Sequence, residues 1–142
     1  MKPVFFLIAL IILTSCSKNS VDNQNCNFLL DLGVNVNINL SLPQYSQLPF
    51  AGNSVYIENA GNGGIIVAST GADFLAWDAS DPNHIPSSCS TLVPSGLNAT
   101  CGCDDANEYS LVTGQLLGGK SLPCSLKNYR VEKNGNNLLI FN

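Results

Sequence analysis

Two cysteines separated by one glycine, Cys101 and Cys103, lie in the segment CGCDDANEYSLVTG. Closely spaced thiols in a polar turn are typical of one half of a metal-binding hairpin. The only histidine of the chain, His84, joins them and Cys89 in a Cys₃His set that suits zinc by ligand type. However, the spacing is poor for zinc, and disulfide formation in an oxidising compartment would consume the thiols. We therefore expect no metal here and a loop role for His84, whose ring would bond a carbonyl group or water.

Four acidic residues accompany these cysteines: Asp81, Asp104, Asp105 and Glu108. Hard cations such as calcium prefer carboxylate oxygens, but CDDANE lacks the alternation of a calcium loop and its bidentate glutamate. A solvated acidic surface is expected, with a weak calcium site as the alternative. His84, Asp104 and Asp105 would be the residues to hold a metal if one is bound. No catalytic residue is expected, because a Ser-His-Asp triad would have to use His84 and no Gly-x-Ser-x-Gly elbow is present.

The amino terminus has the pattern of a bacterial lipoprotein signal peptide. Lys2 precedes an apolar run, Val4 to Leu13, that is too short to span a bilayer as a permanent helix. The run ends in a Leu-Thr-Ser-Cys sequence that resembles a lipobox, which implies cleavage before Cys16 and lipidation of that cysteine. Residues 1–15 are then the signal peptide and residues 16–25 begin with the lipidated cysteine and continue as a flexible tether. We expect a lipid anchor in the bacterial cell envelope, on the periplasmic side or in the outer membrane.

Composition narrows the class of partner. The 142-residue chain has a formal net charge of −4 and only six Lys and Arg residues, none of them clustered. Nucleic-acid binding is therefore not expected. The same charges give no help at an anionic membrane surface, so the lipid would do the anchoring. Residues 26–142 have the length of one domain.

Short strands are predicted after the tether. In VNVNINLSL the apolar residues alternate with Asn and Ser from Val34 to Leu42, the period of a half-buried strand. SVYIE, GIIVAS, DFLAWD, EYSLVTG, NYRVEK and NLLIFN are similarly short and rich in β-branched or aromatic residues. Asn134-Gly135 predicts a hairpin turn between the last two. An all-β sandwich or barrel is expected, in which residues 79–107 form a loop-rich subdomain stapled by disulfides.

The order of these elements resembles a Rieske domain. The similarity covers roughly residues 64–142, and it rests on FLAWDASDPNH, CSTL, ATCGCDDANEYSLVTGQLLGG and SLKNYRVEKNGNNLLIF. That family has a strand ending in an aromatic-Asp pair, a Cys-x-His finger, a Cys-x-Cys-His finger, an aromatic-x-x-x-x-Gly strand and a closing hairpin. A group of bacteroidete lipoproteins has this layout, often with Asp-Pro-Asn-His in the first finger. The resemblance implies an antiparallel Rieske-like fold over residues 26–142.

The cluster ligands of that family are mostly missing. A Rieske centre places two cysteines on one iron and two histidines on the other. By the resemblance, the four ligand positions fall on Asp81, Asn83, Cys101 and Asp104, of which only the cysteine keeps the family residue. One histidine in the chain does not supply two imidazoles. We expect no cofactor and degenerate cluster-binding loops over residues 81–105; the alternative is a 2Fe–2S electron-transfer protein with non-standard ligands.

The resemblance also implies a disulfide between Cys89 and Cys103, the positions that clamp the two fingers together in the family. If Cys16 is lipidated, five of the six cysteines remain, so at least one thiol is left over. A Cys26–Cys124 bond would tie the amino terminus to the sheet and leave Cys101 unpaired. Cys101–Cys124 is a competing pairing, because connectivity does not follow from sequence alone.

These inferences favour a non-enzymatic protein. We expect a lipid-anchored envelope protein with a binding or structural role, whose partner is another envelope protein that contacts residues 81–105. Membrane contact would be made through the N-terminal lipid.

Overall fold

The computed structural model describes residues 26–142 of the chain. The predicted signal peptide (residues 1–15), the lipidated Cys16 and the tether (residues 16–25) lie outside the described residues and stay predictions. Across residues 26–142, no helix combines the length and the apolar character needed to cross a membrane. The regular secondary structure of this part of the chain is almost entirely β, and its single helical element is the short 3-10 helix η1 (Pro43–Tyr45).

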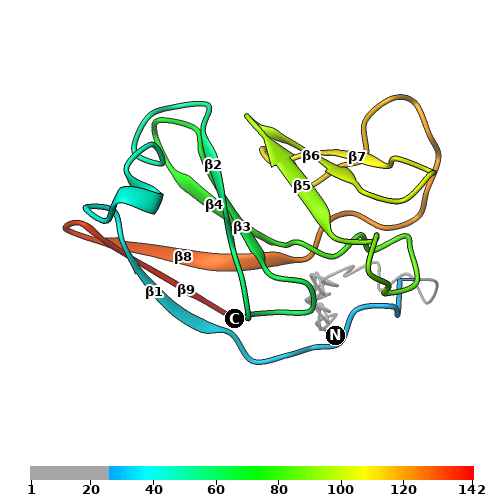
Figure 1. The fold of residues 1–142 in the computed structure, drawn as a ribbon, viewed down its shortest axis with the longest axis horizontal. Helices are drawn as coiled ribbons and strands as arrows, with labels where there is room; N and C mark the ends of the chain where they lie inside the picture. Colours follow the sequence, from blue (N-terminus) through cyan, green and yellow to red (C-terminus); the bar gives the residue numbers. More distant parts are fainter. Residues whose placement is uncertain (1–25) are drawn as a thin grey trace, which may run out of the picture.

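The larger part of the fold is a curled antiparallel sheet of six strands (Figure 1). Its members are β1 (Asn35–Asn39), β2 (Ser54–Ile57), β3 (Ile65–Ser69), β4 (Phe74–Asp78), β8 (Asn128–Asn134) and β9 (Asn137–Phe141). They lie in the order β1-β9-β8-β4-β3-β2. Because β8 pairs directly with β4, the chain between them leaves the sheet and returns to the same place.

A second antiparallel sheet lies within this excursion. It contains β5 (Leu92–Ser95), β6 (Asn98–Cys101) and β7 (Glu108–Ser110), with β6 in the middle. The predicted loop-rich subdomain is thus more regular than expected, because β5 and β6 form a hairpin within it. Strand β5 was not predicted because it contains Pro94, and proline lacks the N–H group that pairs with a neighbouring strand. However, β5 is an edge strand, where proline is tolerated.

Strand β3 serves two cores, and all five of its residues are buried. Ile65 and Val67 belong to the core of the six-stranded sheet, whereas Ile66 and Ala68 belong to a second core shared with the small sheet. Successive side chains of a strand point to opposite faces, so a strand covered on both faces is apolar without alternation. Trp77 of β4 lies in the second core, beneath the inserted subdomain.

Asp78 ends β4 as a fully buried carboxylate. Its oxygens accept hydrogen bonds from the backbone N–H groups of Asn62 (2.8 Å), Gly63 (3.3 Å) and Ser80 (2.9 Å), from the Asn62 side-chain amide (2.9 Å) and from the Tyr129 hydroxyl (2.6 Å). Five donors offset the cost of burying the group. The glycine-rich segment NAGNGG is therefore held against β4, as a structural loop.

Candidate functional site

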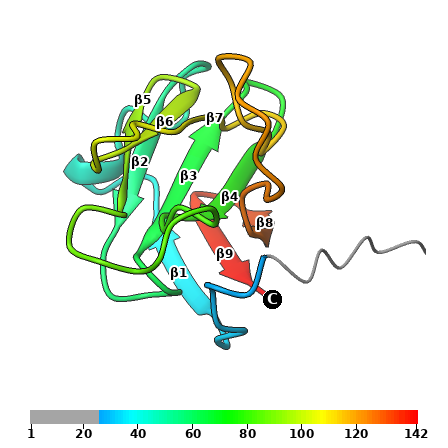
Figure 2. The ribbon, with the colours of Figure 1, turned by 90° about the vertical axis from the view of Figure 1, so that its right-hand side faces the viewer.

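Three loops meet at one end of the molecule, and we call them the loop tip: residues 81–90 between β4 and β5, residues 102–107 between β6 and β7, and residues 118–124 before β8. Figure 2 faces this end. Side chains of the first loop bond to groups of both other loops, as the next paragraphs describe. The loop tip contains most of the residues that the sequence singled out.

Asp81 lies at the centre of the loop tip with no exposed surface. One carboxylate oxygen accepts hydrogen bonds from the Tyr109 hydroxyl (2.5 Å) and the Asn83 backbone N–H (2.8 Å). The other accepts a hydrogen bond from the Asn107 side-chain amide (2.9 Å). The expected solvated acidic surface therefore does not include Asp81, whose carboxylate is enclosed and accepts from these three donors as well as contacting the Cys101 thiol.

Asn83 joins the first loop to the third. Its side-chain amide donates to the Tyr109 hydroxyl (2.7 Å) and to the Cys124 carbonyl (2.7 Å), and its side-chain oxygen accepts from the Cys124 backbone N–H (3.0 Å). Tyr109 therefore accepts from Asn83 and donates to Asp81. Burial, reinforced by Asp81, raises the pKa of the Tyr109 hydroxyl far above its ordinary value, so this hydroxyl stays protonated and remains a donor.

Two disulfides hold the loop tip. The loop disulfide joins Cys89 to Cys103, and the terminal disulfide joins Cys26 to Cys124. This agrees with the pairing that the resemblance implied and with the second pairing that the sequence left open. Gly102 shows how closely the two fingers approach, because a Cβ atom there would lie 2.8 Å from the Cys89 carbonyl oxygen.

Cys101 is the one unpaired cysteine among residues 26–142, and it is buried. Burial raises the pKa of its thiol to about 11, with a smaller contribution of the same sign from Asp81. The thiol points at the Cys89 carbonyl oxygen, 3.8 Å away. Such a protonated, enclosed thiol is a poor nucleophile at neutral pH.

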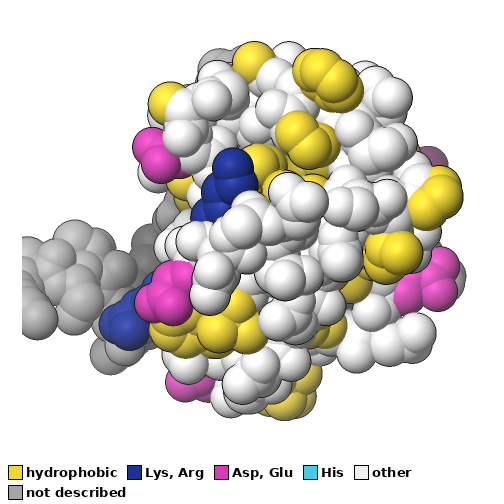
Figure 3. All heavy atoms as spheres, turned by 90° about the vertical axis from the view of Figure 1, so that its left-hand side faces the viewer, with side chains coloured by type: hydrophobic (Ala, Val, Ile, Leu, Met, Phe, Trp, Pro, Cys, Tyr) yellow, Lys and Arg dark blue, Asp and Glu magenta, His cyan; other side chains and the backbone are white. Residues whose placement is uncertain are grey.

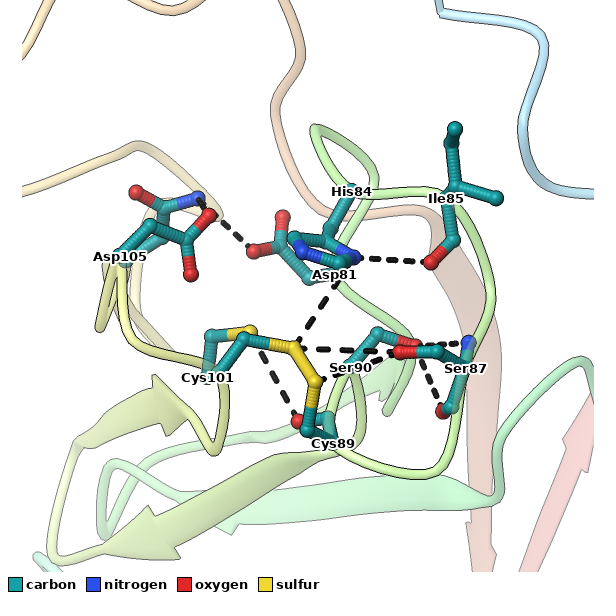
Figure 4. Close-up of a disulfide and its surroundings, with 10 residues drawn as sticks. Asp81, His84, Ile85, Ser87, Cys89, Ser90, Cys101 and Asp105 are labelled. Atoms are coloured by element: carbon teal, nitrogen blue, oxygen red, sulfur yellow. Dashed lines mark hydrogen bonds between the residues drawn. A yellow bond between two sulfur atoms is a disulfide. The ribbon is translucent and has the colours of Figure 1, made fainter.

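His84 lies beside the loop disulfide (Figure 4). Its Nδ1 atom is 2.8 Å from the Ile85 carbonyl oxygen, the type of contact expected for a loop histidine, and 3.9 Å from the Cys103 sulfur. Potential ligand atoms of His84, Cys89 and Cys103 all lie within 4.8 Å of one another. The same is true of Cys101, Cys103 and Asp105.

The acidic residues of this region are dispersed. Asp104 and Asp105 are exposed, and an Asp105 oxygen accepts from Asn107 (3.0 Å). Glu108 accepts from the Asn98 amide (2.9 Å) instead. Within the described chain, no three carboxylates lie close enough to share an ion, and Asp104 belongs to neither group of potential ligands.

Tyr109, Asn107 and Lys120 take part in this site without having been predicted. The Lys120 ammonium donates to the Asp105 carbonyl and to the Asn107 side-chain oxygen (3.1 Å). Tyr109 carried the one usable signal, because a tyrosine on a buried strand must find a partner for its hydroxyl. Nothing in the sequence identified Asp81 as that partner.

Comparison with known proteins bears on the fold. No protein-family model matches the chain, and no curated protein matches it. Among solved structures, it is similar to the chain described as "Complex of reduced oxygenase and oxidized ferredoxin in carbazole 1,9a-dioxygenase", with 17% identity and a TM-score of 0.51 over 76% of this chain and 93% of that one. The fold is Rieske-like.

A second solved structure, the ferredoxin of carbazole 1,9a-dioxygenase from Nocardioides aromaticivorans IC177, is 19% identical, with a TM-score of 0.48 over 76% of this chain and 95% of that one. At the identity of the first match, the likeness concerns the fold alone. The expected Rieske-like antiparallel architecture with a disulfide-stapled subdomain is thus confirmed.

Proposed function

We propose that this protein is a lipid-anchored envelope protein whose Rieske-like domain holds no 2Fe–2S cluster and acts as a binding or structural module rather than an enzyme. The observation that carries the proposal is the hydrogen-bond network of the loop tip. Asp81 and Asn83, which stand at the first-finger ligand positions, use their side-chain atoms to bond Tyr109, Asn107 and the backbone of Cys124. These bonds give the loop tip a connection that does not require a metal.

Ligand chemistry supports the same proposal. A Rieske cluster needs two imidazoles and two thiolates, whereas the whole chain has one histidine. Of the three cysteines in the subdomain, Cys89 and Cys103 are bonded to each other, and Cys101 carries a proton at neutral pH. We infer that the residues present do not fit the cluster.

The loop tip is also the surface that we propose for a partner. Ile85 is 66% exposed at its edge, and Asp104 and Asp105 lie exposed on the neighbouring loop. The loop disulfide and the buried polar network restrain these loops, so the surface is ordered before binding. Figure 3 shows the opposite end, where acidic, basic and hydrophobic side chains are scattered among neutral ones.

Iron and acid-labile sulfide analysis of protein purified without oxygen tests the absence of a cluster. We expect neither element in stoichiometric amount and no visible absorption band. Stoichiometric iron and sulfide with an EPR-active reduced state would instead establish the alternative, an electron-transfer protein with non-standard ligands.

The anchor and the partner need separate experiments. Mass spectrometry of the mature protein from membranes should find a diacylglyceryl group on Cys16, and Cys16→Ser should release the protein from the membrane fraction. Crosslinking from position 85 should give an adduct with an envelope protein. Reversal of both charges, Asp104→Lys with Asp105→Lys, should abolish that adduct, whereas Glu132→Lys on β8 should not; an unchanged adduct would exclude the proposed surface.

A further inference from the structure

Several sulfur and nitrogen atoms lie close together at the loop disulfide, and the proposed function gives them no role. His84, Cys89 and Cys103 form one group of potential ligands, and Cys101, the same Cys103 and Asp105 form a second. Because Cys103 belongs to both groups, ligand atoms of His84, Cys89 and Cys101 all lie within 4.8 Å of its sulfur. Three thiolates and one imidazole form a ligand set typical of structural zinc sites.

We propose that reduction of the loop disulfide creates a binding site for one zinc-class cation, held by the sulfur atoms of Cys89, Cys101 and Cys103 and by the ring of His84. A dithiol reductant supplies two electrons and two protons, and is itself oxidised to a disulfide. Its thiolate can reach Cys89, which is exposed, whereas Cys103 is buried. Each of the three thiols then releases one proton as the cation binds, and the histidine binds in its neutral form.

The distances allow this site after local side-chain movement. Tetrahedral zinc has bonds of about 2.3 Å to sulfur and about 2.0 Å to nitrogen, which places the ligand atoms roughly 3.5 to 3.8 Å apart. The His84 Nδ1 atom already lies 3.9 Å from the Cys103 sulfur, and the remaining separations within each group are at most 4.8 Å. Reduction lets the two bonded sulfurs separate to the required spacing, and the exposed Cys89 side chain has room to turn.

The backbone of the second loop is held independently of the disulfide. The Ala106 N–H donates to the Cys103 carbonyl (2.9 Å), and the Cys101 N–H donates to the Asn107 carbonyl (2.8 Å). The first loop is held by the bonds of Asp81 and Asn83. The ligands therefore stay near one another when the disulfide opens, so the ordering cost of binding is small.

Existing contacts of His84 and Cys101 must be exchanged. The His84 Nδ1 atom would leave the Ile85 carbonyl, which lies on an exposed residue where water can replace it. The Cys101 thiol would leave the Cys89 carbonyl, a weak bond at 3.8 Å, and its contact with the Asp81 carboxylate, which keeps its other donors. The raised pKa of the thiol is no obstacle, because a coordinating metal deprotonates a thiol.

Cobalt(II) titration tests the site, since cobalt occupies zinc sites and reports thiolate ligation by charge-transfer absorption. The full chain would carry Cys16→Ser, Cys26→Ser and Cys124→Ser, so that only the three proposed thiols remain, and circular dichroism would verify its fold. We expect one equivalent of cobalt, displaced by zinc, after reduction and none in the oxidised protein. Equal binding in both forms, or a reduced protein that stays unfolded with and without zinc, would overturn the proposal.

Single substitutions in that background assign the ligands. Cys101→Ser should remove about one third of the charge-transfer intensity, because one of three thiolates is lost, and His84→Ala should weaken zinc binding at least about tenfold. Asp104→Asn, in the same loop but outside both groups, is the matched control and should bind as the parent does. Spectra and affinities unchanged by Cys101→Ser and His84→Ala would exclude the assigned ligands. Reduced wild-type protein should gain thermal stability with added zinc, which checks the result without the background substitutions.

Discussion

The Tyr109→Phe substitution tests whether the buried polar network holds the loop tip together. The lost hydroxyl donates to Asp81 at 2.5 Å and accepts from Asn83 at 2.7 Å. A hydrogen bond to a charged group contributes about 1.5 to 3 kcal/mol, and an ordinary one about 1 kcal/mol. Because the Asp81 carboxylate is fully buried and keeps two amide donors besides a contact with the Cys101 thiol, water does not replace the lost bond.

We therefore expect Tyr109→Phe to lower the free energy of unfolding by about 2 to 4 kcal/mol. Guanidinium denaturation with both disulfides oxidised measures this change, which should appear as a lower midpoint at an unchanged m-value. Thermal unfolding should show a fall in Tm of about 10 °C for a domain of this size.

Tyr129→Phe provides the matched comparison. Its hydroxyl donates to the buried carboxylate of Asp78 at 2.6 Å, but Asp78 keeps four other donors. The loss should therefore be smaller, about 1 to 2 kcal/mol. We reason that a buried carboxylate with fewer hydrogen-bond donors loses more stability when one donor is removed. A Tyr109→Phe effect below about 1 kcal/mol, or no larger than that of Tyr129→Phe, would refute this reasoning.

Three further results are expected. Loss of the terminal disulfide, with a sequence separation of 98, should lower the free energy of unfolding more than loss of the loop disulfide, with a separation of 14. Chain entropy gives losses of about 4.7 and about 3 kcal/mol, which denaturant unfolding measures, and the reverse order would contradict this account. Burial raises the pKa of Cys101 from its ordinary 9.0 to about 11, so the folded state keeps a proton that the unfolded chain loses in this window. The free energy of unfolding should therefore fall as pH rises from 9 to 11, and it should fall less in Cys101→Ala. Iodoacetamide at pH 8 should label the Cys101 thiol only after denaturation, and rapid labelling of the folded protein would contradict its burial. Gly102→Ala should lower the free energy of unfolding by about 1 to 3 kcal/mol, because its Cβ would lie 2.8 Å from the Cys89 carbonyl oxygen. In Gly118→Ala the new Cβ meets no atom within 4 Å, but the residue has a positive φ, so this variant should show the effect of backbone strain alone.

Most strands could be predicted because their patterns are local. Alternating apolar residues predicted β1, and clusters of β-branched and aromatic residues predicted β2, β3, β4, β8 and β9. The β5–β6 hairpin was missed because Pro94 has no N–H group to donate to a neighbouring strand, which argues against a strand there. Only the position of a strand in the sheet shows whether that N–H group is needed.

The candidate site depended on the sequence for its chemistry and on the fold for its geometry. The single histidine by itself argues against a Rieske centre, which needs two imidazoles. The difference in burial between Asp81 and Asp104 could not be predicted from the sequence. Both were expected at a solvated acidic surface, but only Asp81 is enclosed. Its partners Asn107 and Tyr109 come from 26 and 28 residues further along the chain.

The amino-acid sequence by itself determined the strand-forming segments, the turns and the supply of thiols and imidazole, because these follow from residue type and near-neighbour spacing. Only the tertiary structure decided which cysteine stays unpaired and which carboxylate is buried. Both depend on loops that are distant in sequence and meet once the two sheets pack against each other, and the enclosure that results is what alters the protonation and reactivity of each group.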